Sequence, residues 1–113
     1  MDCLFCGIVQ GKVPAKVIYK DDDILAFHDI SPKAPIHILI IPTKHIATLD
    51  DVEQDDILIV GKILFRAKEI ASQLGISERG YRLVLNCHVD GGQSVYHIHC
   101  HLLGGRKMAW PPG

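Results

Sequence analysis

The sequence lacks an excess of charge of either sign, because its 12 lysine and arginine residues nearly balance 13 aspartate and glutamate residues, for a formal net charge of −1. Proteins that bind nucleic acid or an anionic membrane surface usually present a strongly basic patch. The composition gives no sign of one. We therefore expect neither nucleic acid nor a membrane among the partners of this protein.

Long apolar runs are also missing, since every run falls well short of the about 20 residues that span a bilayer. No basic segment followed by an apolar stretch indicates a signal peptide, and we expect a cytoplasmic protein. Internal repeats and low-complexity stretches are absent as well. With 113 residues, 48% hydrophobic and 22% charged, the sequence predicts one globular domain over residues 1–113.

Histidine, by contrast, is frequent: there are seven, and residues 97–103 read His-Ile-His-Cys-His-Leu-Leu. Alternation of imidazole and apolar side chains is the period of a strand. It predicts a strand that buries its apolar residues on one face and presents His97, His99 and His101 on the other. Histidine serves nucleophilic, acid–base and metal chemistry near neutral pH.

Two kinds of chemistry suit such a strand. A His-x-His pair can chelate a catalytic zinc ion, or one imidazole can attack a substrate covalently while its neighbours hold a phosphate. The preceding residues 90–96 contain two glycines, which let backbone N–H groups approach an anion, followed by the polar side chains of Gln93 and Ser94. Alone this loop is typical of a hairpin turn. Beside the histidines it favours a phosphate.

Four cysteines are present, two of them in the motif Cys3-Leu4-Phe5-Cys6. In a reducing compartment this spacing indicates half of a metal site or a redox pair rather than a structural disulfide. The alternative is a pair of small apolar residues in a short N-terminal helix. The motif by itself leaves both interpretations open.

The remaining pattern predicts an α+β fold. We expect a hairpin over residues 17–30, a buried strand over 37–42 and another strand over 81–87. A long helix is expected over 51–74, with Asp50 as N-cap. Its apolar stripe consists of Ile57, Val60, Leu64, Ala67, Ala71 and Leu74. The predicted order gives an antiparallel sheet of about five strands, with the long helix packed on one face.

Residues 91–113, from Gly-Gly-Gln-Ser through the three histidines to Trp-Pro-Pro-Gly, resemble the signature of the histidine triad (HIT) family. The likeness is greatest to its Hint-like branch of purine nucleoside phosphoramidases. Cys100 stands where the family pattern has a hydrophobic residue, and cysteine packs as a small hydrophobe. The resemblance implies a HIT-like fold and a homodimer in which the sheet extends across both subunits.

The resemblance also implies an activity. His99 would attack the α-phosphorus of a purine nucleoside phosphoramidate, and water would then hydrolyse the nucleotidyl-histidine. His101 and His37 would assist as catalytic residues. The alternatives are a dinucleoside polyphosphate hydrolase, which the Trp-Pro-Pro-Gly ending disfavours, and a nucleotide- or protein-binding module with incidental hydrolysis. No organic cofactor is implied.

Matching positions supply the binding residues that the resemblance implies. The base would lie among Phe5, Ile8, Phe27, His28 and Ile30, the ribose on Asp29, the phosphate on Asn86, Gly92, Gln93, Ser94 and His101, and the leaving group near Trp110 of a partner subunit. Relatives that keep the cysteine pair complete a structural zinc site. The ligands here would be Cys3, Cys6, His45 and His97.

Overall fold

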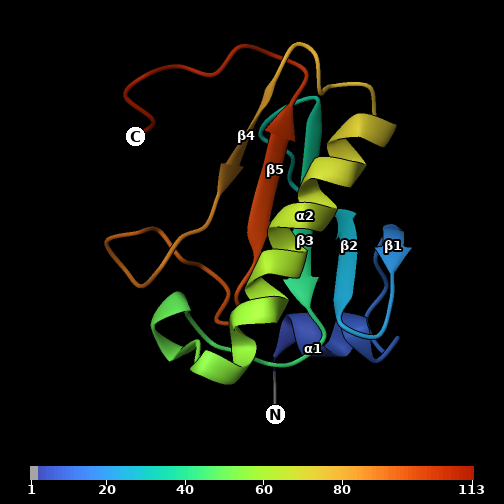
Figure 1. The fold of residues 1–113 in the computed structure, drawn as a ribbon, viewed down its shortest axis with the longest axis vertical. Helices are drawn as coiled ribbons and strands as arrows, with labels where there is room; N and C mark the ends of the chain where they lie inside the picture. The colour runs from blue at the N-terminus through green and yellow to red at the C-terminus, as the bar shows by residue number, and fades with distance from the viewer. Residues whose placement is uncertain (1–2) are drawn as a thin grey trace.

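The structure is a computed structural model that describes residues 3–113, and its centre is an antiparallel sheet (Figure 1). The strands are β1 (Val17–Lys20), β2 (Ile24–His28), β3 (Ile36–Pro42), β4 (Tyr81–Val84) and β5 (Cys100–Gly104), in the order β1-β2-β3-β5-β4. The helices are α1 (Leu4–Val9) and α2 (Ile57–Gln73), and two short 3-10 turns, η1 (Leu49–Asp51) and η2 (Gln54–Asp56), precede α2. The predicted α+β fold, with five antiparallel strands and one long helix, is confirmed.

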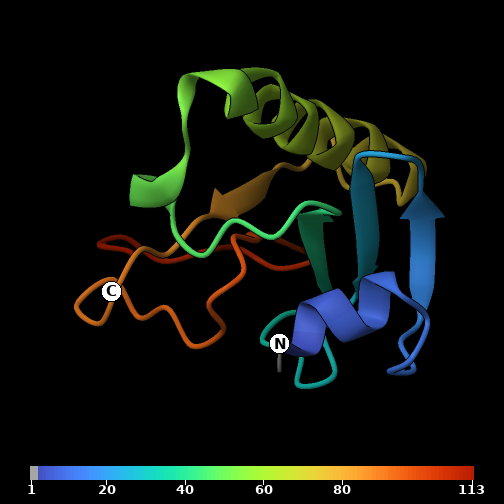
Figure 2. The same cartoon turned by 90° about the horizontal axis from the view of Figure 1, so that it is seen from below.

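The two helices lie on opposite faces of the sheet (Figure 2). Because side chains alternate across a strand, β3 sends Ile38 and Ile40 toward α2, and sends His37, Leu39 and Ile41 to the other face. On the α2 side the core consists of Ile24, Ala26, Ile38, Ile40, Ile63, Ala67, Ile70, Ala71, Ile76, Cys100 and Leu102. On the α1 side it consists of Phe5, Leu25, Phe27, Leu39 and Ile41.

The long helix begins later than the sequence predicted. It starts at Ile57, and its first residues are preceded by η1 and η2. Asp50 is not the N-cap: the capping boxes pair Thr48 with Asp51 and Glu53 with Asp56. The carboxylates of Asp51 and Asp56 accept from the backbone N–H groups of Thr48 and Glu53, and Asp56 is the N-cap of α2.

The buried face of α2 also differs from the predicted stripe. Ala67 and Ala71 of the predicted stripe are buried, together with Ile63 and Ile70, whereas Ile57 and Leu64 of the predicted stripe are largely exposed. Many apolar residues in this helix made the stripe ambiguous, and the sheet selected one of two adjacent faces. The other face stays apolar and uncovered in the single chain.

The strand with the histidines is shorter than predicted. β5 begins at Cys100, so only His101 of the three lies in the ladder, and His97 and His99 lie in the segment that enters it. The strand predicted over 81–87 likewise ends at Val84. The predicted burial of Ile98, Cys100 and Leu102 is confirmed. The chain bends between Val95 and His97, just before this strand.

Candidate active site and metal centre

The α1 face of the sheet carries a pocket of about 970 Å³. Its walls are formed mainly by α1, the segment 13–16, the segment 27–39 and the residues around β5. Among its lining residues are Phe5, Ile8, Phe27, His28, Asp29, Ile30, His37, Ser94, His99 and His101, all of which the sequence proposed as site residues. The volume is that of a small-molecule site.

His99 is held in one tautomer. Its side chain is 5% exposed, and its Nδ1 lies 2.8 Å from the backbone oxygen of His97. A carbonyl oxygen only accepts, so Nδ1 carries the proton and donates it. The other nitrogen, Nε2, is therefore unprotonated in the neutral ring and retains its lone pair. An imidazole of this kind is suited to nucleophilic attack.

His37 and His101 are joined in a chain of hydrogen bonds. The backbone N–H of Lys33 donates to Nδ1 of His37 at 3.0 Å, which leaves the proton of a neutral His37 on Nε2. That Nε2–H faces Nδ1 of His101 at 2.9 Å and a carboxylate oxygen of Asp29 at 3.4 Å. His101 thus accepts at Nδ1 and keeps its own proton on Nε2. It can donate that proton to a bound oxyanion.

Burial keeps these rings neutral. It lowers the pKa of His99 and of His37, although the nearby Asp29 carboxylate partly opposes the effect. Burial, assisted by the neighbouring His99 and His37 rings, lowers the pKa of His101 to about 4. Near neutral pH the three imidazoles are consequently uncharged, as the tautomers above require.

Some residues proposed from the sequence lie elsewhere. Gln93 is buried and bridges loops, since its side chain donates to the Ala47 and Val95 oxygens. Asn86 donates to the Gly91 oxygen and lines a second, smaller cavity beside the C-terminal tail. Gly92 is exposed outside the pocket lining, and Trp110 is 80% exposed on the tail. Their direct contact with a ligand stays a prediction.

Other contributors were missed by the sequence reasoning. Val13, Pro14, Ala15 and Lys16 line the pocket, although they belong to a connection with no recognisable motif. Lys33 acts through its backbone N–H, and no side-chain pattern signals that role. Pro32 and Pro35, which lie on either side of Lys33 in the sequence, also line the pocket.

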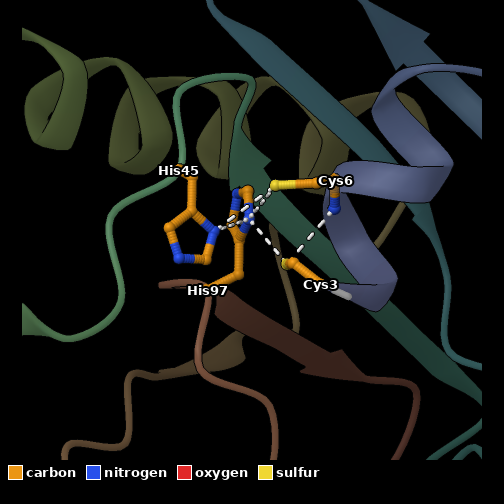
Figure 3. Close-up of side chains that lie close together, drawn as sticks. All are labelled: Cys3, Cys6, His45 and His97. Atoms are coloured by element: carbon orange, nitrogen blue, oxygen red, sulfur yellow. Dashed lines mark hydrogen bonds between the residues drawn. The ribbon is translucent and has the colours of Figure 1, made fainter. Parts of the chain in front are cut away.

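A second cluster lies between α1 and the segment that enters β5 (Figure 3). Cys3, Cys6, His45 and His97 each place one donor atom within 4.8 Å of all the others. The Sγ–Nδ1 separations are 3.4 Å for Cys3–His97, 3.4 Å for Cys6–His45 and 3.6 Å for Cys6–His97, and the two Nδ1 atoms are 3.3 Å apart. A tetrahedral zinc ion with ordinary bond lengths holds S and N about 3.6 Å apart and N and N about 3.3 Å apart. The predicted donor set therefore comes together with spacings that fit zinc.

Hydrogen bonds fix the tautomer of His97 and the orientation of the Cys3 sulfur. His97 is fully buried, and its Nε2 lies 2.8 Å from the Pro42 oxygen, so Nε2 carries the proton and Nδ1 offers a lone pair to the cluster. The backbone N–H of Cys6 donates to Sγ of Cys3 at 3.3 Å. That contact caps α1 and orients one sulfur. The helix interpretation and the metal interpretation of the Cys-x-x-Cys motif are thus compatible.

Comparisons with known proteins agree with this geometry. The family model described as HIT domain matches residues 10–108. The solved structure of a HIT family hydrolase from Legionella pneumophila superposes with a TM-score of 0.97 at 61% identity, covering 99% of this chain and 100% of that one. The 14 kDa zinc-binding protein of Brassica juncea is 47% identical, covering 99% of this chain and 100% of that protein. The histidine triad nucleotide-binding protein of Candida albicans superposes with a TM-score of 0.83 at 30% identity, covering 97% and 83%.

The pKa of His101 gives a test of the site. Its ring should stay neutral through the usual imidazole value of about 6.5 and gain a proton only near pH 4. The unfolded chain takes up that proton at the higher pH, so the stabilisation is present above about pH 6.5 and is lost as the pH falls toward 4. Histidine NMR titration, with the resonance assigned through His101→Asn, measures the midpoint. A midpoint at the ordinary value would contradict the described packing.

Proposed function

The chain belongs to the HIT domain family, and on that premise we propose that it is a purine nucleoside phosphoramidase that works through a nucleotidyl-histidine on His99. The observation that carries the proposal is the free Nε2 of His99 at the large pocket, fixed by donation from Nδ1 to the His97 oxygen. A pocket that only binds nucleotides has no need of a nucleophile. The free lone pair on Nε2 of His99 therefore favours an enzyme over a binding module.

The ligand would occupy the pocket in a definite orientation. Phe5, Ile8 and Phe27 provide an apolar wall for a purine base. Asp29 accepts one hydrogen bond from the Ser31 N–H at 2.7 Å, and its remaining lone pairs can accept from ribose hydroxyls. That arrangement directs the α-phosphate toward His99, His101 and Ser94.

The reaction follows from the tautomers. The lone pair on Nε2 of His99 forms a bond to the α-phosphorus while the P–N bond breaks, and the departing amine takes up a proton from solvent. His101, with its proton on Nε2, donates to a phosphoryl oxygen whose negative charge grows in the transition state. Water next attacks the phosphorus and releases a proton to solvent, the bond to His99 breaks, and the nucleoside monophosphate leaves. Nε2 of His99 regains its lone pair.

Replacing His99 tests this chemistry. His99→Asn should reduce turnover of an adenosine or guanosine phosphoramidate to background, while nucleoside monophosphate binding changes by less than about tenfold, roughly 1.4 kcal/mol. Binding should persist because Asp29 and the apolar wall remain. Acid-free quenching of the wild-type reaction should trap a nucleotide on His99, detectable by mass spectrometry.

His101→Ala should cause only a partial loss of activity. It removes a proton donor but leaves the nucleophile, so measurable turnover should remain. Diadenosine polyphosphates assayed in parallel test the alternative substrate class. Full activity in His99→Asn would overturn the proposal. Faster cleavage of diadenosine polyphosphates would instead reassign the substrate.

We further propose that Cys3, Cys6, His45 and His97 hold a structural zinc ion. The spacings described above support it, as does the likeness to a zinc-binding protein. The ion would join α1, which lines the pocket, to the segment that carries His99. Its chemistry would be restricted to cross-linking these four side chains.

Dialysed protein purified without chelator should accordingly contain about one zinc per chain on this four-ligand interpretation. The double variant Cys3→Ser, Cys6→Ser should lose the metal and melt at a lower temperature, whereas Cys100→Ala, which removes a buried thiol outside the cluster, should keep it. Elemental analysis and thermal melts are the measurements. The site would be refuted if the wild-type protein contained no metal and its melting temperature did not change when zinc was added.

A homodimer is the third part of the proposal. Ile57, Leu58, Leu64 and Phe65 lie on one side of α2 with exposed fractions of 49–76%. β4 is an edge strand of the sheet, and an unpaired edge invites another strand. Together these surfaces can bury apolar area and extend the sheet across two copies. Trp110 on the exposed tail would then approach the partner's pocket.

Light scattering at micromolar concentration should therefore give a dimer mass. Phe65→Glu should shift the equilibrium toward monomers, because it places a charge in the apolar contact. Gln73→Glu adds the same charge to the helix outside this exposed apolar surface, and the variant should stay dimeric. A monomeric wild type would reject the dimer, and unchanged kinetics in Trp110→Ala would reject the cross-subunit role of the tail.

A further inference from the structure

A third group of metal-binding side chains lies outside both sites already described. Asp50 in η1 and Cys87 and His88 in the loop after β4 each place a donor atom within 4.8 Å of the other two. Nε2 of His88 is 3.2 Å from a carboxylate oxygen of Asp50. The group combines a thiol, an imidazole and a carboxylate from two separate loops. None of the three lines the large pocket or belongs to the cysteine–histidine cluster.

The backbone holds this loop in an unusual conformation. His88 has a φ of 62°, the only positive value at a non-glycine position within residues 3–113. This left-handed region is unfavourable for a residue that carries a Cβ, and glycine avoids the penalty. The conformation is maintained by reciprocal hydrogen bonds, since the His88 N–H donates to Oε1 of Gln93 and the Gln93 N–H donates to the His88 oxygen.

Gln93 also fixes the second loop. Its side chain is 7% exposed, and its Nε2 donates to the Ala47 oxygen at 2.8 Å. The chain segment that leads to Asp50 is thereby tied to the loop that carries Cys87 and His88. These contacts of Gln93 bring the loop of Cys87 and His88 close to Asp50, in addition to the contact between His88 and Asp50 themselves. The group is a preorganised arrangement on rigid backbone.

The chemical types of the three donors indicate which metal ions the group can bind. Thiolate, imidazole and carboxylate together suit zinc and similar transition ions, whereas calcium and magnesium prefer oxygen alone. Zinc with nitrogen and oxygen ligands holds them about 3.4 Å apart, close to the 3.2 Å between His88 and Asp50. Both of these side chains are more than half exposed, so they can turn toward a shared ion and let it exchange with solvent.

We propose that Asp50, Cys87 and His88 form a second, exchangeable binding site for zinc or a similar divalent transition ion. Three protein ligands leave one tetrahedral position for water. The site binds more weakly than the four-ligand cluster, because it has fewer ligands and two of them are more than half exposed. Bound metal cross-links η1 to the loop whose next residues, Gln93 and Ser94, lead to the pocket.

Cobalt(II) titration of the zinc-loaded protein tests the site. A further equivalent of cobalt should bind with the near-ultraviolet charge-transfer absorption of a cobalt–thiolate bond. Cys87→Ser should abolish that band, and His88→Asn and Asp50→Asn should each weaken binding by at least about tenfold, by analogy with the loss of one ligand interaction. Asp90→Asn removes a carboxylate from the same loop but outside the group, and should bind cobalt as the wild type does.

A second measurement needs no variant. Added zinc should protect Cys87 of the wild-type protein from alkylation by iodoacetamide, followed by mass spectrometry of the peptide. Cobalt binding without a thiolate band, a band that persists in Cys87→Ser, or alkylation of Cys87 at the same rate with and without zinc would each overturn the proposal. The two cysteines at the N-terminus do not enter this readout.

Discussion

The candidate site depends on hydrogen bonds between histidine rings and the backbone. His97 donates to the Pro42 oxygen, His99 donates to the His97 oxygen, and His37 accepts from the Lys33 N–H. Each bond occupies one ring nitrogen and thereby decides which lone pair or proton faces the neighbouring chemistry. A set of free imidazoles on a surface would sample both tautomers. Here the backbone selects one.

His97 connects the two centres through different atoms. Its ring directs Nδ1 to the cysteine–histidine cluster, while its backbone oxygen accepts the proton of the His99 ring. A shift of this residue would therefore disturb the metal ligands and the orientation of the nucleophile together. The short segment between Val95 and Ile98 has to satisfy both requirements, and the strand ladder begins after it, at Cys100.

Much of this arrangement could be read from the sequence. Alternation predicted the buried residues around Cys100, β-branched runs predicted β3, and the resemblance carried over ten residues that do line the pocket. The predictions that failed concern features that only the tertiary structure determines. Apolar side chains of α2 lie around much of its circumference, so packing against the sheet determined that Ile63 is buried and Leu64 is exposed. The contributions of Lys33 and Pro42 are made by backbone atoms, which residue identity does not report.

The pocket joins two segments that are far apart in the sequence, because Phe5 and Ile8 of α1 line it together with His99 and with His101 of β5. During synthesis, a ribosome releases α1 and the β1–β2 hairpin long before the last strand emerges. β5 then inserts between β3 and β4, which are not neighbours without it. A nascent chain therefore has neither a complete sheet nor a complete pocket until β5 has left the exit tunnel. Ligand binding can stabilise the finished protein, but it cannot guide the folding of the growing one.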